Sequence, residues 1–353
     1  MAIADLPNNL MNQLNPDDSK RKSDHIILAL QSQTHINEAD SRFYYEPMIS
    51  GFPDKPLNKI PFAGKELKVP IWISSMTGGH LLSGKINHNL ARACKEFGMG
   101  MGLGSCRMLL NEDTYFKDFD VRSMMGDENP LFANLGIAQI EELIEKKETD
   151  VLRRLIDRLK ADGLIIHVNP LQEWMQPEGN IIHNSPADTI EKLLEKIDFQ
   201  LIVKEVGQGF GPQSIRRLLQ LPLTAIEFGA FGGTNFAKVE IQRNTILKQE
   251  LHQPFVKVGV PAEEMVDLVN DLVLNGDKFA CNQLIISGGI HSYLDGFYLT
   301  QKSLMPSIYA QASAFLKYSQ GEYDDLQQFV TAQIEGYRMA QNFLTLKVPK
   351  KSL

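Results

Sequence analysis

The 353 residues include 36 basic and 43 acidic side chains, and the resulting net charge of -7 argues against a general nucleic-acid-binding protein. A hydrophobic fraction of 43% with 22% charged residues is ordinary for a globular protein with a sizeable core. The three cysteines are widely spaced without a C-x-x-C pair, which argues against a disulfide framework or a structural zinc site. No apolar run approaches about 18 residues, so we expect no membrane span and a cytoplasmic location.

Residues 1–68 are predicted to form an N-terminal arm and a lead-in of loops and short strands. The motif RKSDH at residues 21–25 precedes an apolar run, and Ser23 or Asp24 could cap a helix there. Two cations beside a helix N-terminus suggest a nearby anion, although a solvated basic turn is the alternative. Residues 46–70 are interrupted by prolines and glycines, which is typical of loops.

From residue 69 onward, short apolar runs are separated mostly by helix-like stretches. Eight of these runs are predicted strands, at residues 71–76, 100–104, 131–136, 163–166, 200–207, 223–229, 283–289 and 307–312. Helices are expected at residues 82–97, 139–160 and 323–346. Apolar runs without alternation are typical of parallel strands that are buried on both faces. The pattern therefore predicts a TIM (β/α)8 barrel over residues 69–345, with a C-terminal tail at 346–353.

Polar side chains follow the fourth predicted strand at the point where Pro170 should end it. His167, Asn169, Gln172 and Glu173 would then lie together at the strand's carboxyl end, where barrels bind ligands. One carboxylate among amides suits Mg²⁺, which takes other ligands from substrate phosphates. The alternatives are a polar turn with caps and, for His167, a histidine satisfied within the core.

Lys204 lies inside the otherwise apolar fifth strand, and a buried ammonium needs a partner. Its neighbour Glu205 should face the opposite side of the strand, which leaves Lys204 to meet a ligand. A structural ion pair between Lys204 and another strand's carboxylate is the alternative.

Glycine-rich turns follow the sixth and seventh predicted strands, with the sequences FGGTN at 231–235 and SGG at 287–289. Glycine lets backbone N–H groups approach a phosphate closely, and late strands of barrels often hold one. Each turn alone could be a plain tight turn, but the two together favour a phosphate-bearing ligand.

Eight motifs occur in a specific order: RKSDH, SSMTGG, MGLGSCR, ANLG, HVNPLQE, KEVGQG, GGTNF and SGGI. From about residue 21 to residue 290 the chain resembles the type 2, FMN-dependent isopentenyl diphosphate isomerases. The resemblance implies a TIM barrel that interconverts isopentenyl and dimethylallyl diphosphate in isoprenoid biosynthesis, using reduced FMN, Mg²⁺ and NADPH as reductant. We also expect a homo-oligomer without nucleic-acid or membrane partners.

The resemblance also implies roles for individual residues. The flavin would contact Ser75, Met76, Thr77, Ser105, Asn134, Lys204, Thr234, Gly288, Gly289 and Ala310. The substrate would contact Arg21, Lys22, His25, Ser105, Arg107, His167, Asn169 and Gln172. Gln172, Glu173 and Lys204 would be catalytic, with Glu173 binding the Mg²⁺. Either the flavin or Gln172 would carry the proton, and the flavin is preferred because an amide is a poor acid.

Several positions depart from the family pattern. Cys106 stands where Gln is usual, and His291 stands where Arg is usual after SGGI. Gln311 follows Ala310 where an Ala-Gly pair is usual. These changes bear mostly on the flavin phosphate. Two other functions therefore stay open: an FMN-dependent 2-hydroxy acid oxidoreductase with His291 as its base, and a non-catalytic flavin- or phosphate-binding barrel.

Overall fold

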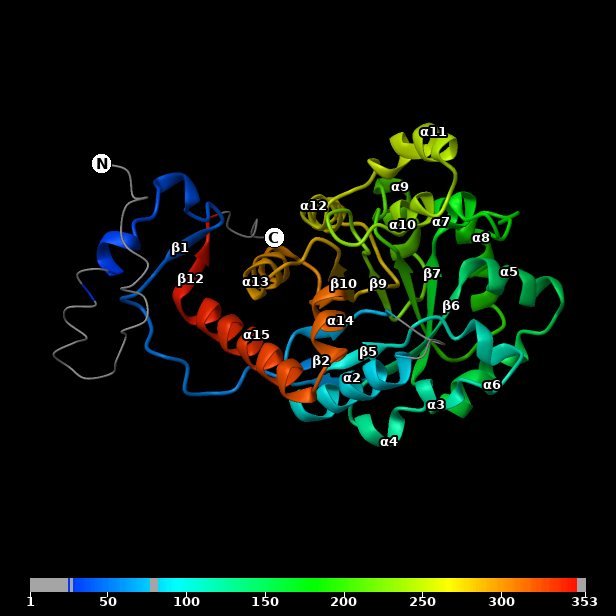
Figure 1. Ribbon diagram of the computed structural model, residues 1–353, viewed down its shortest axis with the longest axis horizontal. Helices are drawn as coiled ribbons and strands as arrows, with labels where there is room; N and C mark the ends of the chain where they lie inside the picture. Colours follow the sequence, from blue (N-terminus) through cyan, green and yellow to red (C-terminus); the bar gives the residue numbers. More distant parts are fainter. Residues whose placement is uncertain (1–24, 26–27, 77–81, 348–353) are drawn as a thin grey trace. The chain divides into compact units, whose positions relative to one another are not determined.

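The computed structural model describes residues 25, 28–76 and 82–347, and its centre is a closed barrel of eight parallel strands (Figure 1). The strands are β4 (Ile71–Ile73), β5 (Gly100–Gly102), β6 (Leu131–Gly136), β7 (Gly163–Val168), β8 (Gln200–Glu205), β9 (Ala225–Glu227), β10 (Leu284–Ser287) and β11 (Ser307–Gln311). They pair in chain order, and β11 closes the barrel against β4. The predicted TIM barrel is confirmed, with most strands shorter than expected because their last residues belong to the loops.

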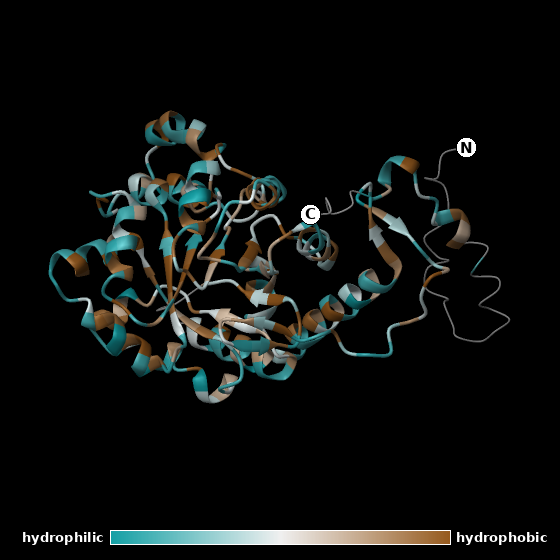
Figure 2. Cartoon of the chain, turned by 180° about the vertical axis from the view of Figure 1, so that it is seen from behind, coloured by the Kyte–Doolittle hydropathy of each residue, from teal (hydrophilic) through white to brown (hydrophobic). Residues whose placement is uncertain are grey.

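Helices surround the strands. The longer ones are α2 (Ser83–Phe97), α5 (Ile137–Glu145), α6 (Asp150–Leu159), α7 (Pro170–Met175), α8 (Pro186–Leu194), α9 (Pro212–Leu219), α10 (Phe236–Gln242), α11 (Ile246–Val256), α12 (Ala262–Leu274), α13 (Tyr293–Lys302), α14 (Ser313–Ser319) and α15 (Tyr323–Phe343). Shorter turns are η3 (Ile36–Glu38), η4 (Arg107–Leu110), α3 (Phe116–Phe119) and α4 (Arg122–Met125). Figure 2 shows hydrophobic residues concentrated in the barrel strands, as burial on both faces requires.

The single helix predicted at residues 139–160 is wrong, because α5 and α6 are separate helices. Lys147, between the two helices, has a left-handed φ of 60°, which interrupts the helical conformation. At 100° per residue, one continuous helix would point the apolar residues of α5 and α6 in directions roughly 100° apart. The break lets both sets face the barrel. The predicted tail helix is also too long, since it ends at Phe343 and Leu344–Leu346 form the extended segment β12.

An antiparallel hairpin fills the amino-terminal end of the barrel. It consists of β2 (Ile60–Phe62) and β3 (Lys65–Leu67), joined by Ala63 and Gly64 with φ of 51° and 74°. Positive φ at both turn residues matches the twist of a tight hairpin. Phe62 and Leu67 belong to the core cluster inside the barrel, and the Phe62 ring lies 5.4 Å from that of Trp72.

The described residues up to Phe43 form a unit distinct from residues 44–347, which contain the barrel. The domain boundary predicted at residue 68 stays a prediction. The helix cap expected at Ser23 or Asp24 lies outside the described residues, and His25 is exposed. Among the helices that the structure describes, none combines the length and apolarity needed to cross a membrane.

Candidate active site

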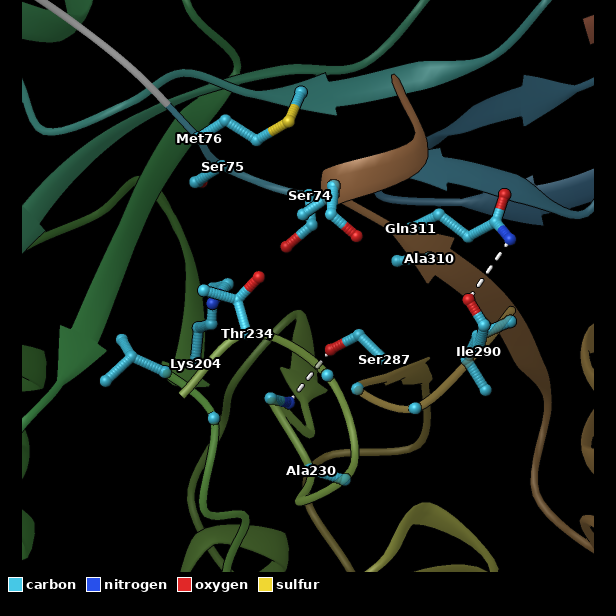
Figure 3. Close-up of a pocket in the computed structure, with 18 of the residues that line it drawn as sticks. Ser74, Ser75, Met76, Lys204, Ala230, Thr234, Ser287, Ile290, Ala310 and Gln311 are labelled. Carbon is cyan, nitrogen blue, oxygen red and sulfur yellow. Dashed lines mark hydrogen bonds between the residues drawn. The ribbon is translucent and has the colours of Figure 1, made fainter. Parts of the chain in front are cut away.

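A cavity of about 290 Å³ lies at the carboxyl ends of β4, β8, β9, β10 and β11 (Figure 3). Most of the residues predicted to contact flavin line it: Ser75, Met76, Lys204, Thr234, Gly288, Gly289 and Ala310. Ser74, Ser287, His291 and Gln311 complete much of its polar wall, while Val206, Phe236, Ile290 and Leu316 are apolar. A concave site with apolar walls and few polar groups is typical of a cofactor or ligand site.

The two glycine-rich turns meet on one side of the cavity. Gly288 has a φ of 89°, and a Cβ there would collide with the carbonyl of Ala230. A Cβ on Gly233 would lie 3.2 Å from the Gly289 nitrogen. The close approach of these turns thus depends on glycine. Within the described residues, the N–H groups of Gly288 and Gly289 donate to no protein acceptor, so both are available to a phosphate.

Two of the departures from the family pattern border this cradle. The side-chain amide of Gln311 is 4% exposed, and its Nε2 donates to the carbonyl of Ile290 at 3.2 Å. His291 is exposed at the rim of the cavity. The cradle therefore fits a phosphate through backbone donors, with less fixed positive charge than an arginine would supply.

The floor of the cavity holds Lys204 next to a carboxylate that the sequence analysis missed. Lys204 Nζ donates to the backbone carbonyl of Glu205 at 2.7 Å. Glu227 stands opposite Lys204 in the strand register, is fully buried and accepts a hydrogen bond from Ser74. Burial raises the pKa of the Glu227 carboxyl, and the Lys204 ammonium is the strongest influence that opposes this shift. Lys204 thus has an ionisable neighbour on another strand.

The side chain of Glu205 faces away from Lys204, as predicted, and accepts hydrogen bonds from the backbone of the following loop. Its carboxylate accepts the N–H groups of Gly207, Gln208 and Gly209 at 2.7, 2.6 and 2.8 Å. Burial raises the pKa of Glu205, although these three donors oppose the shift. The carboxylate therefore fixes the loop that carries Val206 and Gly207 to the cavity.

His167 and Asn134 form a pair on β7 and β6. His167 Nδ1 lies 2.8 Å from Asn134 Oδ1, while Asn134 Nδ2 donates to the Leu103 carbonyl at 3.1 Å. Because Asn134 offers its oxygen, His167 Nδ1 carries the proton and Nε2 is left as an acceptor. Burial, followed by the nearby Lys204, lowers the pKa of His167 to about 3. Asn134 orients a neutral histidine and does not line the cavity.

The polar residues that follow β7 come together as one hydrogen-bonded set at the start of α7, and the strand ends before Pro170 as predicted. Asn169 Nδ2 donates to Glu173 Oε1 at 3.1 Å and to Gln172 Oε1 at 3.3 Å. Glu173 Oε2 also accepts the backbone N–H of Asn180 at 2.7 Å. Gln172 Nε2 donates to Glu240 Oε1 on α10 at 3.2 Å. Glu240 was missed because a helical glutamate gives no local signal of a buried contact.

The donor set around Glu173 is compatible with a magnesium ion that takes most of its ligands from elsewhere. Across the described residues, no three histidine, cysteine, aspartate or glutamate side chains gather in a way that could hold a metal. Mg²⁺ commonly binds through one or two carboxylates together with substrate phosphates and waters. The half-buried Glu173 carboxylate can serve in such a site.

Other predicted site residues lie away from the cavity wall. Ser105 and Arg107 are exposed after β5, and Arg107 N lies 3.5 Å from Ser105 Oγ. Cys106, between them, is fully buried, and burial raises the pKa of its thiol to about 12. Arg21, Lys22 and Thr77 lie outside the described residues.

Comparison with known proteins shows the family. An isopentenyl-diphosphate delta-isomerase of Rickettsia felis is 33% identical over 305 residues, covering 85% of each chain. The chain belongs to the isopentenyl-diphosphate delta-isomerase family. The family's enzyme from Rickettsia typhi is 32% identical over 79% of this chain and 80% of its own. No family model matches the sequence. The protein is thus an enzyme of this family.

Solved structures of other proteins share the fold of this family member. A mandelate oxidase with a monooxide FMN adduct aligns over 87% of this chain and 88% of its own, with a TM-score of 0.55 and 13% identity. A flavocytochrome b2 with bound sulfite aligns over 85% and 72%, with a TM-score of 0.59 and 12% identity. At this identity the likeness shows the barrel fold alone.

Proposed function

We propose that the protein is a type 2 isomerase that interconverts isopentenyl and dimethylallyl diphosphate with reduced FMN and Mg²⁺, as a step in isoprenoid biosynthesis. The observation that carries the proposal is the presence of three features at one barrel end of an isomerase-family chain. These are the glycine cradle, the cation Lys204 and the Asn169–Gln172–Glu173 set. NADPH is the proposed reductant, and the cytoplasm the proposed location. The expected homo-oligomer stays part of the proposal.

The cavity has the parts that a phosphate-bearing flavin needs. The N–H groups of Gly288 and Gly289 would hold the phosphate, and the apolar side chains of Val206 and Leu316 would contact the rest of the ligand. When bound, reduced FMN would supply an electron-rich ring that stabilises developing positive charge and exchanges a proton. Lys204 would place its ammonium beside that ring and favour negative charge on it.

The set on α7 would act on the diphosphate side of the substrate. Glu173 would bind Mg²⁺ bridging the diphosphate, and Asn169 fixes the Glu173 carboxylate through its amide. Neutral His167 would offer Nε2 to the substrate, where a nearby diphosphate would favour its protonation. Gln172, held by Glu240, would orient the five-carbon chain. Arg21, Lys22 and Arg107 are proposed to neutralise the diphosphate, and His25 and Ser105 to donate hydrogen bonds to the substrate.

The hydroxy-acid oxidoreductase alternative has less support. That chemistry needs arginines to hold a carboxylate and a histidine as base. His291 borders the cavity, but no arginine does among the residues that the structure describes. The non-catalytic alternative gives no role to the ordered amide–carboxylate set on α7.

An anaerobic assay tests the proposal. The protein is loaded with FMN, reduced with NADPH or dithionite, and incubated with Mg²⁺ and isopentenyl diphosphate, and dimethylallyl diphosphate is measured. We expect product only with the complete mixture. Conversion that persists without flavin, or an FMN-loaded protein that forms no product, contradicts the proposal. Bleaching of oxidised FMN by 2-hydroxy acids would support the oxidoreductase instead.

The magnesium role is tested by Glu173→Ala. We expect the Mg²⁺ concentration for half-maximal activity to rise about 10–100-fold, while FMN affinity stays unchanged. Glu178→Ala is the matched control, because Glu178 lies in the turn after α7, is exposed and pairs with Arg243 at 2.8 Å. Equal Mg²⁺ dependence of the two variants would remove Glu173 from the metal site.

A further inference from the structure

Polar side chains from three strands converge on Glu227 beneath the cavity. Ser74, which follows β4, donates a hydrogen bond to the Glu227 carboxylate. Lys204 of β8 stands opposite Glu227 in the register. Ser287 of β10 borders the cavity and accepts the Gly229 N–H at 2.8 Å, and its hydroxyl also favours ionised Glu227. Figure 3 shows Ser74, Lys204 and Ser287 around one space.

The burial of Glu227 calls for a compensating charge. The side chain is 0% exposed, and its Oε2 has no hydrogen-bond partner in the described structure. A buried carboxylate without compensation is strongly destabilising. The Lys204 ammonium is the cation whose charge acts on Glu227, and Lys204 itself is only 7% exposed. Lys204 and Glu227 therefore each lower the energetic cost of burying the other.

Other ionisable groups near Lys204 are committed elsewhere. On the same strand, the Glu205 carboxylate accepts hydrogen bonds from three backbone N–H groups of the following loop. His167, opposite Lys204 on β7, binds Asn134 and stays neutral. Glu227 is thus the carboxylate that faces Lys204 from a neighbouring strand within the described residues.

We propose that Glu227 is a positioning residue, whose buried carboxyl group holds the Lys204 side chain at the cavity floor to meet negative charge on the bound ligand. The interaction between Glu227 and Lys204 does not depend on any bound ligand. The consequence for the ligand rests on the proposed function, because it assumes that an anionic flavin occupies the cavity. Ser74 supports the arrangement by donating to Glu227.

The first test uses the ligand-free protein. Glu227→Gln keeps the size of the side chain and removes its charge. We expect Lys204 to be acylated by a succinimidyl ester at least about threefold faster at pH 7.5, because its amine is no longer held by the carboxylate. Peptide mass spectrometry measures this rate against exposed Lys238 in the same sample. Glu227→Asp restores the charge and should return the rate toward that of the wild type.

The second test measures FMN affinity by fluorescence titration. Glu227→Gln should weaken FMN binding several-fold, and Glu227→Asp should recover most of the loss. An unchanged Lys204 acylation rate in a folded Glu227→Gln variant overturns the proposal, as does failure of Glu227→Asp to restore it. If Glu227→Gln does not fold, Ser74→Ala is measured instead, and faster acylation of Lys204 is again required. If the wild type binds no FMN, the proposed function fails while the acylation test still decides the role of Glu227.

Discussion

The two ends of the barrel treat buried charge differently. At the amino-terminal end, Arg122 is 3% exposed, and its guanidinium donates four hydrogen bonds. It donates to the carbonyls of Lys160, Gly126 and Asn129 at 2.7, 2.9 and 2.9 Å, and to Asp162 at 2.8 Å. Asp162 in turn accepts the Leu131 N–H at 2.8 Å and pairs with Lys65 of the hairpin at 2.6 Å.

At the carboxyl end, buried polar atoms are left without protein partners. Glu227 Oε2, Asn169 Oδ1, Ser75 Oγ and Gln311 Oε1 have none in the described structure. Each such atom costs stability unless something else satisfies it. Gln200 Oε1 and Ser307 Oγ, at the amino-terminal end, also lack partners, so the contrast concerns the buried charges. The protein itself satisfies the Arg122–Asp162 pair, whereas Glu227 keeps one unpaired oxygen beneath the cavity, as expected for an end that is arranged for a ligand.

The largest effect is expected from Arg122→Ala. It removes buried Arg122 from the half-buried Asp162 and from three carbonyls, so the free energy of unfolding should fall by about 3–5 kcal/mol. Urea unfolding measures the loss, and activity per folded molecule should not change. Arg217→Ala is the control, because Arg217 forms an exposed pair with Glu191 and should cost about 0–1 kcal/mol. Similar losses in both variants would contradict the structural role of Arg122.

Lys204→Ala tests the other end of the barrel. Removing the cation should weaken FMN binding by about 1.5–3 kcal/mol, the value of a charged contact. This corresponds to roughly 10–150-fold in the dissociation constant measured by fluorescence titration. Lys238→Ala, on the exposed side of α10, should bind FMN normally. A Lys204→Ala protein that is as yellow and as active as the wild type would exclude Lys204 from the site.

The low pKa of His167 predicts acid sensitivity at the ligand end. Because the folded-state pKa lies near 3, below the ordinary value of 6.5, unfolding takes up a proton as the pH falls below 6.5. Relative to pH 7.5, the wild type should lose about 2 kcal/mol of unfolding free energy at pH 5 through this group. His167→Gln should lose less, and His88→Gln, on α2, should match the wild type. An identical pH slope for His167→Gln would contradict the buried neutral histidine.

The sequence predicted the barrel because its strands are continuous apolar runs. It also identified Lys204, a lone charge inside such a run. Glu227 gives the same signal, between Ile226 and Phe228, and could have been found in this way. Glu240 could not, since its contact with Gln172 joins positions 68 residues apart through tertiary packing. The break near Lys147 escaped notice because residues on both sides of it are strong helix formers.

The smallest effect is expected at Gln311, at the edge of the glycine cradle. Gln311 Nε2 binds the carbonyl of Ile290, which follows Gly289, and so restrains the turn that would hold the phosphate. Gln311→Ala removes one neutral hydrogen bond, worth about 0.5–1.5 kcal/mol. FMN should therefore bind roughly 2–10-fold more weakly, while riboflavin, which lacks the phosphate, should bind as before.

Parallel fluorescence titrations with FMN and riboflavin separate this role of Gln311 from simple obstruction. If the Gln311 side chain filled space that the phosphate needs, Gln311→Ala would tighten FMN binding selectively. Equal weakening of both ligands would place the effect on the flavin ring side of the cavity. Only selective weakening of FMN binding fits a Gln311 that supports the phosphate turn, because only then does its hydrogen bond to Ile290 act on the phosphate.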